Sequence, residues 1–167
     1  FIFFNWTLRP LLDVRLPAKK VSGPLKNIIF DMCDDIDGLK DGLITDPRQC
    51  PFDPKKHLPL CQGAELEDCF TQAQIDALAH IYGDVTSRGK PYFPGIPVGG
   101  EVAVQNGKMT ANAWQSAMIN EDGTPGVVNT NFSEGFFKYL AFVKDDPNYD
   151  WRTFDFDKDI EKLDQFK

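Results

Sequence analysis

The 167-residue sequence lacks several features that would assign a function directly. No apolar run approaches the roughly 18 residues that a membrane-spanning helix needs, so we expect no membrane span. The net charge of −7 leaves no excess of basic residues. This balance argues against nucleic acid or an anionic membrane as a partner, because either would require a basic face.

The signature motifs of common enzymes are also absent. There is no G-x-S-x-G nucleophile elbow, no H-E-x-x-H metal motif, no P-loop and no G-x-G-x-x-G loop. Of the two histidines, His57 is expected at the surface and His80 on the solvated side of a helix, with no nucleophile near it in sequence. By its own residues the chain is therefore expected to be a binding or structural module.

The composition that remains is that of a globular protein. Hydrophobic residues make up 42% of the chain and aromatic residues 13%, including 14 phenylalanines. This content is too apolar for a disordered segment, and the length is sufficient for one domain with a buried core. The first twelve residues, FIFFNWTLRPLL, lack the basic start and cleavage site of a signal peptide, so we expect them to lie within a longer folded chain.

An acidic stretch between Cys33 and Cys50 is the most informative part of the sequence. It contains five acids within 13 residues, and Gly38 and Gly42 each follow one of them, which permits tight turns. Two carboxylates about 5 Å apart repel by roughly 3 kcal/mol at an effective dielectric constant near 20. The five acids are Asp34, Asp35, Asp37, Asp41 and Asp46.

A calcium ion would remove this repulsion, since calcium prefers six to eight oxygen ligands. The spacing offers carboxylates from Asp34, Asp37 and Asp41 and main-chain carbonyls from Leu39 and Leu43. We expect Ile36, Leu39, Leu43 and Ile44 to anchor this loop on a core. The alternative is a solvated acidic turn, because Asp-Gly pairs are common in turns. An EF-hand fits poorly, since a leucine and an arginine occupy ligand positions.

Four cysteines, Cys33, Cys50, Cys61 and Cys69, allow three pairings. Sequential pairing would close two short adjacent loops, the first of which encloses the acidic stretch and is worth about 3 kcal/mol. The alternatives are four buried thiols or a zinc site, which no C-x-x-C motif supports. The sequons at Asn5 and Asn131 are candidate glycosylation sites and, together with the cysteines, predict a secreted protein.

The patterning predicts mainly helices. Residues 1–16 read as a helical or irregular lead-in and residues 24–32 as a short helix. Thr71 and Gln74 form a capping box that begins a helix ending near Gly83. Residues 84–107 indicate loops and short strands with a hairpin around residues 87–90. Helices are predicted over 109–119, over 132–143 and from about Asp157.

Several segments resemble the tannase and feruloyl esterase family, in the same order and over residues 17 to 160. They are CDDIDGLKDGLITDPRQCPFDP, LCQGAELEDCFTQAQIDAL, IYGDVTSRGKPYFPGIPVGGE and DWRTFDFDKDI. The acidic stretch with its flanking cysteines is a specific match, and the segment Phe93–Glu101 is moderately specific.

The resemblance implies a lid domain inserted in an α/β-hydrolase that carries a Ser-His-Asp triad. The chain would be α+β, mostly helical and loop-rich with short strands, and stabilised by one calcium ion and the disulfides Cys33–Cys50 and Cys61–Cys69. Residues 1–16 would lead in from the hydrolase domain, 17–155 would form the lid, and 156–167 a return helix. The implied calcium ligands are those named above. The triad itself has no counterpart in this sequence, so none of its residues is assigned a catalytic role.

The implied reaction is hydrolysis of aromatic acid esters through an acyl-enzyme, with the catalytic hydrolase part of the same protein as partner. This chain would cover the substrate pocket, with Trp114, Phe132, Phe136 and Tyr139 as candidate pocket residues. An aromatic stripe at helical spacing is more typical of plain core packing. The alternative function is an independent secreted calcium-binding recognition module without catalysis.

Overall fold

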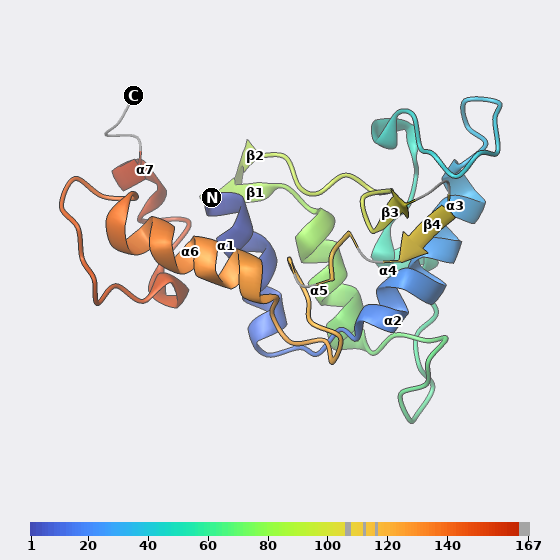
Figure 1. Ribbon diagram of the computed structural model, residues 1–167, viewed down its shortest axis with the longest axis horizontal. Coiled ribbons are helices and arrows are strands. Elements are labelled where there is room, and N and C mark those ends of the chain that lie inside the picture. Colours follow the sequence, from blue (N-terminus) through green and yellow to red (C-terminus); the bar gives the residue numbers. More distant parts are fainter. Residues whose placement is uncertain (106–107, 112, 116, 164–167) are drawn as a thin grey trace.

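The computed structural model describes residues 1–105, 108–111, 113–115 and 117–163. Figure 1 shows an elongated molecule with α6 and α7 at one end and α2, α3, β3 and β4 at the other. Helices α1 and α5 lie between these ends. The helices are α1 (Ile2–Leu8), α2 (Ala18–Lys20), α3 (Lys26–Cys33), α4 (Pro54–His57), α5 (Gln72–Tyr82), α6 (Val127–Tyr139) and α7 (Ile160–Leu163).

The strands form two separate antiparallel hairpins within the described part of the chain. In the first, β1 (Val85–Ser87) pairs with β2 (Lys90–Phe93), which confirms the hairpin predicted around residues 87–90. In the second, β3 (Val102–Gln105) pairs with β4 (Lys108–Ala111). The fold is thus mixed helix and short strand, as predicted, and none of its described helices is long and apolar enough to cross a membrane.

The start of α5 confirms the predicted capping box. The hydroxyl of Thr71 accepts a hydrogen bond from the backbone N–H of Gln74 at 3.2 Å, and the Gln74 amide oxygen accepts one from the Thr71 N–H at 3.1 Å. These reciprocal bonds satisfy two backbone donors that the first helical turn leaves free. Helix α3 also forms, two residues later than predicted, after a π-helical turn at Val21–Leu25 that contains Pro24.

Two of the predicted helices need correction. Where a helix was predicted over 109–119, the described residues form strand β4 and then turns with isolated bridges. A short apolar run fits the spacing of a helix or that of a strand, and here the pairing with β3 favours the strand. The helix predicted over 132–143 begins earlier, at Val127, and ends at Tyr139. The C-terminal helix is short, and residues 164–167 of its predicted range lie outside the described residues.

The core consists of two clusters of buried side chains. The larger joins α2, α3 and α5 with the segment that holds Trp114, Met118 and Ile119. The smaller lies at the α6 end of Figure 1 and contains Leu8, Phe137, Ala141, Trp151 and Phe154. Helix α1 contributes Leu8 to the smaller cluster and packs along α6.

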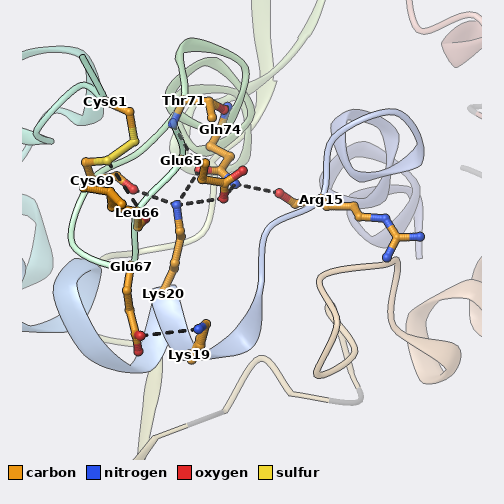
Figure 2. Close-up of polar contacts among 10 residues, drawn as sticks. All are labelled: Arg15, Lys19, Lys20, Cys61, Glu65, Leu66, Glu67, Cys69, Thr71 and Gln74. Atoms are coloured by element: carbon orange, nitrogen blue, oxygen red, sulfur yellow. Dashed lines mark hydrogen bonds and ion pairs between the residues drawn. A yellow bond between two sulfur atoms is a disulfide. The ribbon is translucent and has the colours of Figure 1, made fainter. Parts of the chain in front are cut away.

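A buried ammonium group fixes the second disulfide loop to the larger cluster. Lys20 is only 2% exposed, and its Nζ lies 2.6 Å from the carbonyl oxygen of Cys69 and 2.8 Å from a carboxylate oxygen of Glu65 (Figure 2). The Gln74 amide oxygen accepts a third bond at 3.2 Å. A buried charge is tolerated only when it is paired and hydrogen-bonded, and all three ammonium donors have acceptors here.

Gln74 extends this network to the first residues of the chain. Its amide nitrogen, Nε2, donates hydrogen bonds to the carbonyl oxygen of Arg15 and to a carboxylate oxygen of Glu65, both at 2.8 Å. The disulfide Cys61–Cys69 closes the loop that carries Glu65, with the two Cα atoms 5.0 Å apart. The loop, α2 and α5 are therefore joined through one polar centre, shown in Figure 2.

Replacing Lys20 by methionine should destabilise the protein by about 2 kcal/mol, because the acceptors on Cys69, Gln74 and Glu65 lose their shared donor. The matched control is Lys19→Met, since Lys19 forms an exposed pair with Glu67 at 3.3 Å. That change is expected to alter stability by less than about 0.5 kcal/mol. Urea unfolding of both variants measures the difference, and equal stabilities would contradict the role of Lys20.

Candidate functional site

The candidate site lies where the acidic stretch meets the segment Phe93–Glu101, the two parts of the sequence that carry the most specific motifs. The acidic stretch follows directly from α3. Asp34 caps the C-terminal end of this helix, is itself buried, and accepts a hydrogen bond from the Gly42 N–H at 2.7 Å. Gly38 and Gly42 have positive φ angles, 92° and 80°, which glycine adopts without strain. The stretch is therefore a closed loop.

The other two predicted carboxylate ligands of calcium, Asp37 and Asp41, stabilise turns within this loop. Asp37 accepts hydrogen bonds from the Leu39 N–H at 3.0 Å and from the Thr45 hydroxyl. The bond from Thr45, followed by that from Leu39, lowers the pKa of the Asp37 carboxyl group. Asp41 accepts one from the Leu43 N–H at 3.1 Å. Each carboxylate thus has a backbone donor of its own, as in Asx turns.

The described residues include no group of three or more His, Cys, Asp or Glu side chains gathered closely enough to hold a metal ion. As arranged, Asp34, Asp37 and Asp41 cap backbone N–H groups instead of converging on one point. A calcium ion would need their side chains to rotate inward. Calcium binding by these residues and by the carbonyls of Leu39 and Leu43 stays a prediction.

The prediction that four apolar side chains anchor the loop on the core is wrong for three of them. Ile44 is buried, but Leu39 and Leu43 are 62% and 61% exposed and Ile36 is also exposed. The reason is geometric: the loop is closed by hydrogen bonds on its own backbone, so its tip projects away from the core. Figure 1 shows this segment extending beyond the end of α3.

The disulfide Cys33–Cys50 closes the same loop at its base, with a Cα–Cα distance of 5.3 Å. Together with Cys61–Cys69 it confirms the sequential pairing, so the four cysteines are neither free thiols nor a zinc site.

Next to Cys50, Asp46 caps a 3₁₀ turn at Pro47–Gln49. The bonds from Arg48 and Gln49 hold the pKa of Asp46 far below its usual value.

The segment Phe93–Glu101 packs against both α5 and the acidic loop. Gly95 lies on the end of α5, where a Cβ atom would come within 2.2 Å of the Tyr82 carbonyl oxygen, so no other residue fits. Gly99 has a φ of 92° and faces Ile44 of the acidic loop. These two close contacts explain why the sequence motif has glycine at positions 95 and 99.

Glu101 anchors this segment from inside the protein. Its carboxylate is fully buried and accepts hydrogen bonds from the Tyr82 hydroxyl and, at 2.8 Å, from the Gly99 N–H. Burial raises the pKa of Glu101, and it raises the pKa of Tyr82 well above its usual value, with the neighbouring carboxylate adding to the effect. The sequence analysis missed this pair; the glutamate that ends the motif was the available signal.

Two open grooves flank the contact between the two segments. A groove of about 290 Å³ is lined by Arg48, Phe52 and the segment Pro94–Val98. A second groove, of about 210 Å³, lies between Leu43 and Gly99. Most of their lining is apolar. The grooves and the exposed leucines thus form a largely apolar area at the surface.

The four predicted pocket aromatics do not gather at this site. Trp114 is only 3% exposed and packs against Tyr82 in the larger core cluster, which agrees with the core-packing alternative. Phe132, Phe136 and Tyr139 lie on α6, at the other end of the molecule. Phe132 and Tyr139 are about half exposed. The ring of Phe1 stacks on Phe136 at 5.4 Å and contacts Phe132 at 5.7 Å.

The two sequons differ in the structure. Asn5 is completely buried, and its amide donates to the Trp151 carbonyl oxygen at 2.8 Å, so its prediction as a glycosylation site is corrected. A glycan cannot be accommodated on a side chain enclosed between α1 and the 3₁₀ turn at Trp151–Thr153. Asn131 is exposed on α6 and remains a candidate.

The histidines are more enclosed than predicted. His57 is half-buried, and its Nδ1 accepts a hydrogen bond from the Asp53 N–H at 2.9 Å. His80 is only partly exposed, and its ring stacks on that of Trp6, with the centroids 4.0 Å apart. Neither histidine lies beside a serine or cysteine nucleophile in the described contacts, so no catalytic pair forms.

Comparison with known proteins assigns the class of this chain. Residues 7–167 match the family model described as tannase and feruloyl esterase, and the chain belongs to that family. It is 30% identical over 168 residues to an uncharacterized esterase of Xanthomonas campestris pv. campestris, covering 97% of this chain and 28% of that protein. It is also 30% identical over 132 residues to a probable feruloyl esterase of Aspergillus terreus, covering 76% of this chain and 21% of that protein.

A solved structure shares the fold. The chain aligns with feruloyl esterase B from Aspergillus oryzae at a TM-score of 0.63 and 21% identity, covering 92% of this chain and 29% of that one. A shorter match, 33% identical over 79 residues, relates 41% of this chain to a mono(2-hydroxyethyl) terephthalate hydrolase of Piscinibacter sakaiensis. The chain therefore spans less than a third of the length of these relatives.

The buried carboxyl group gives a pH prediction. Because burial raises the folded-state pKa of Glu101, this group favours folding most below its usual pKa of 4.5 and loses that contribution as the pH rises through the raised value. The free energy of unfolding of wild type minus that of Glu101→Gln should fall from about pH 4.5 to pH 7. Urea unfolding at each pH measures this difference, and the exposed Glu67→Gln variant serves as the surface control. A difference that rises with pH would refute the assignment.

Proposed function

We propose that this chain is the lid portion of a larger, secreted carboxylic ester hydrolase that acts on esters of aromatic acids. The observation that carries the proposal is the family match over residues 7–167 combined with coverage of only 28% of a relative that is itself an esterase. The described residues contain two separate two-stranded hairpins, not the large parallel sheet on which an α/β-hydrolase builds its nucleophile. The chemistry would therefore belong to another part of the protein.

The proposed substrate class follows from chemistry that two relatives have in common. One is named for feruloyl esters and another for a terephthalate ester, and in both acyl groups an aromatic ring is conjugated with the ester carbonyl. In the proposed reaction a serine of the catalytic part attacks the ester carbonyl and expels the alcohol, which leaves an acyl-enzyme. Water then hydrolyses the acyl-enzyme, which releases the aromatic acid and regenerates the serine. The role of this chain would be to hold the ring and exclude water.

The α6 end offers the surface for this role. Phe132 and Tyr139 are exposed, and Phe1 and Phe4 extend the aromatic area from α1, with Phe4 stacked on Phe132 at 5.7 Å. Exposed aromatic groups of this kind mark interaction sites in soluble proteins. We include Phe132, Phe136 and Tyr139 in the proposed pocket roof and leave Trp114 in the core.

The lid role can be tested in the full-length protein with methyl ferulate as substrate. Phe132→Ala should lower kcat/KM about tenfold by removing ring contact, which corresponds to about 1.4 kcal/mol. The control is Leu66→Ala, an even more exposed apolar residue in the second disulfide loop. Equal activity of both variants would exclude Phe132 from the pocket, and a full-length protein without esterase activity would favour a recognition module.

Calcium in the acidic loop remains part of the proposal, with Asp34, Asp37 and Asp41 as carboxylate ligands. Their concentration in one closed loop supports it, since calcium would relieve their repulsion. Excess chelator should then lower the melting temperature by several degrees, and added calcium should restore it. Asp41→Asn should weaken the calcium response, whereas Asp145→Asn in the exposed loop after α6 should not. An unchanged melting temperature with no metal by elemental analysis would refute calcium binding.

Secretion is proposed from the two disulfides, which persist in oxidising compartments. Asn131 is the remaining candidate for a glycan. Its side chain is exposed on α6, while Ser133 of the same sequon is buried in the fold. Attachment would therefore have to precede the packing of α6.

A further inference from the structure

A pair of stacked rings lies at the junction between the two ends of the molecule. Trp6 of α1 and His80 of α5 stack with an interplanar angle of 20° and with centroids 4.0 Å apart. The indole Nε1 of Trp6 donates to the His80 carbonyl oxygen, and the His80 Nε2 meets the Trp6 carbonyl oxygen, both at 3.1 Å. Each residue thus bonds the backbone of the other, which holds α1 against α5.

This pair connects the two core clusters. His80 belongs to α5, whose apolar face lies in the larger cluster, and the edge of Trp6 contacts Phe156 of the smaller cluster at 4.8 Å. Figure 1 shows α1 and α5 side by side between the two ends. Other contacts across the junction are more exposed: Phe3 meets Phe93 at 6.1 Å, and Arg88 pairs with Glu161 at 2.7 Å.

The surroundings of His80 disfavour a positive charge. Burial lowers the pKa of His80 below its usual 6.5; the hydrogen bond to Trp6 opposes this, and the positive charge of Arg9 adds to it. The rings against it are uncharged. The acids four positions before and after His80 are engaged elsewhere: Asp76 with Gln72 and Lys55, and Asp84 with the Gly95 N–H.

We propose that the Trp6–His80 pair is an acid-sensitive hinge, in which protonation of His80 loosens the contact of α1 with α5 and lets the α6 end move relative to the α3 end. A charged imidazolium beside Arg9 would be repelled and would draw water into the junction. The inference concerns this chain alone and does not depend on the lid role.

The chain offers a closely matched set of variants, because His57 is its one other histidine. His80→Gln retains an amide donor for the Trp6 carbonyl but cannot take up a proton in this range. His57→Gln is the histidine control, and Glu101→Gln controls for a different buried titratable group, whose pKa is raised and not lowered. The isolated 167-residue chain is used only if its circular dichroism shows a cooperative fold; otherwise the full-length protein is used.

The experiment follows the Trp6 indole N–H resonance and hydrogen exchange of α1 from pH 8 to pH 5. In wild type, the Trp6 signal should shift with a midpoint below 6.5, and exchange of α1 amides should rise about tenfold relative to α3. Both changes should disappear in His80→Gln and persist in His57→Gln and Glu101→Gln.

Two results would overturn the hinge. One is an α1 transition that is unchanged in His80→Gln. The other is a His80 imidazole in wild type, followed by its own NMR signal, that titrates at or above 6.5. The second measurement needs no variant, so the proposal can be refuted even if His80→Gln fails to fold.

Discussion

The buried ammonium group of Lys20 is the constraint on which the larger half of this structure depends. Without a continuous sheet among its described residues, the chain must join short helices and loops by specific contacts. Lys20 does so by binding the backbone of Cys69, the carboxylate of Glu65 and the amide of Gln74 at once. A charge enclosed in this way permits one arrangement of its acceptors and penalises all others. In the same part of the molecule, the buried carboxylate of Glu101 performs an equivalent task with Tyr82 and Gly99.

These two polar centres place the loops that matter for function. The first fixes the loop between Cys61 and Cys69, and the second holds the Phe93–Glu101 segment against the acidic loop. The acidic loop is then defined at its base by a disulfide and at its centre by hydrogen bonds from its own backbone. Its exposed leucines and the neighbouring grooves leave an uncovered apolar surface. Such a surface is consistent with a chain that belongs to a larger esterase.

Local features could be predicted from the sequence because their causes are local. The capping box at Thr71, the hairpin around residues 87–90 and the two short disulfide loops depend on residues close together in the chain. The helix predicted over 109–119 was wrong because its apolar spacing also suits a strand, and the partner strand decides. The burial of Asn5 and the stacking of His80 on Trp6 depend on contacts across more than 70 residues, which no local pattern encodes. The family match relates the chain to longer esterases of which it covers less than a third.

The disulfides have a further consequence for how this chain is made. Their partners are separated by 17 and 8 positions, so each bridge joins sulfurs that diffuse together rapidly while still in an unfolded segment. All four cysteines precede α6 in the sequence, so both bridges can form before α6 emerges from the ribosome. Within residues 1–167 no cysteine follows Cys69, so the part of this chain that emerges later adds no competing thiol. The covalent frame around α3 and the second disulfide loop can thus be closed before α6 is made.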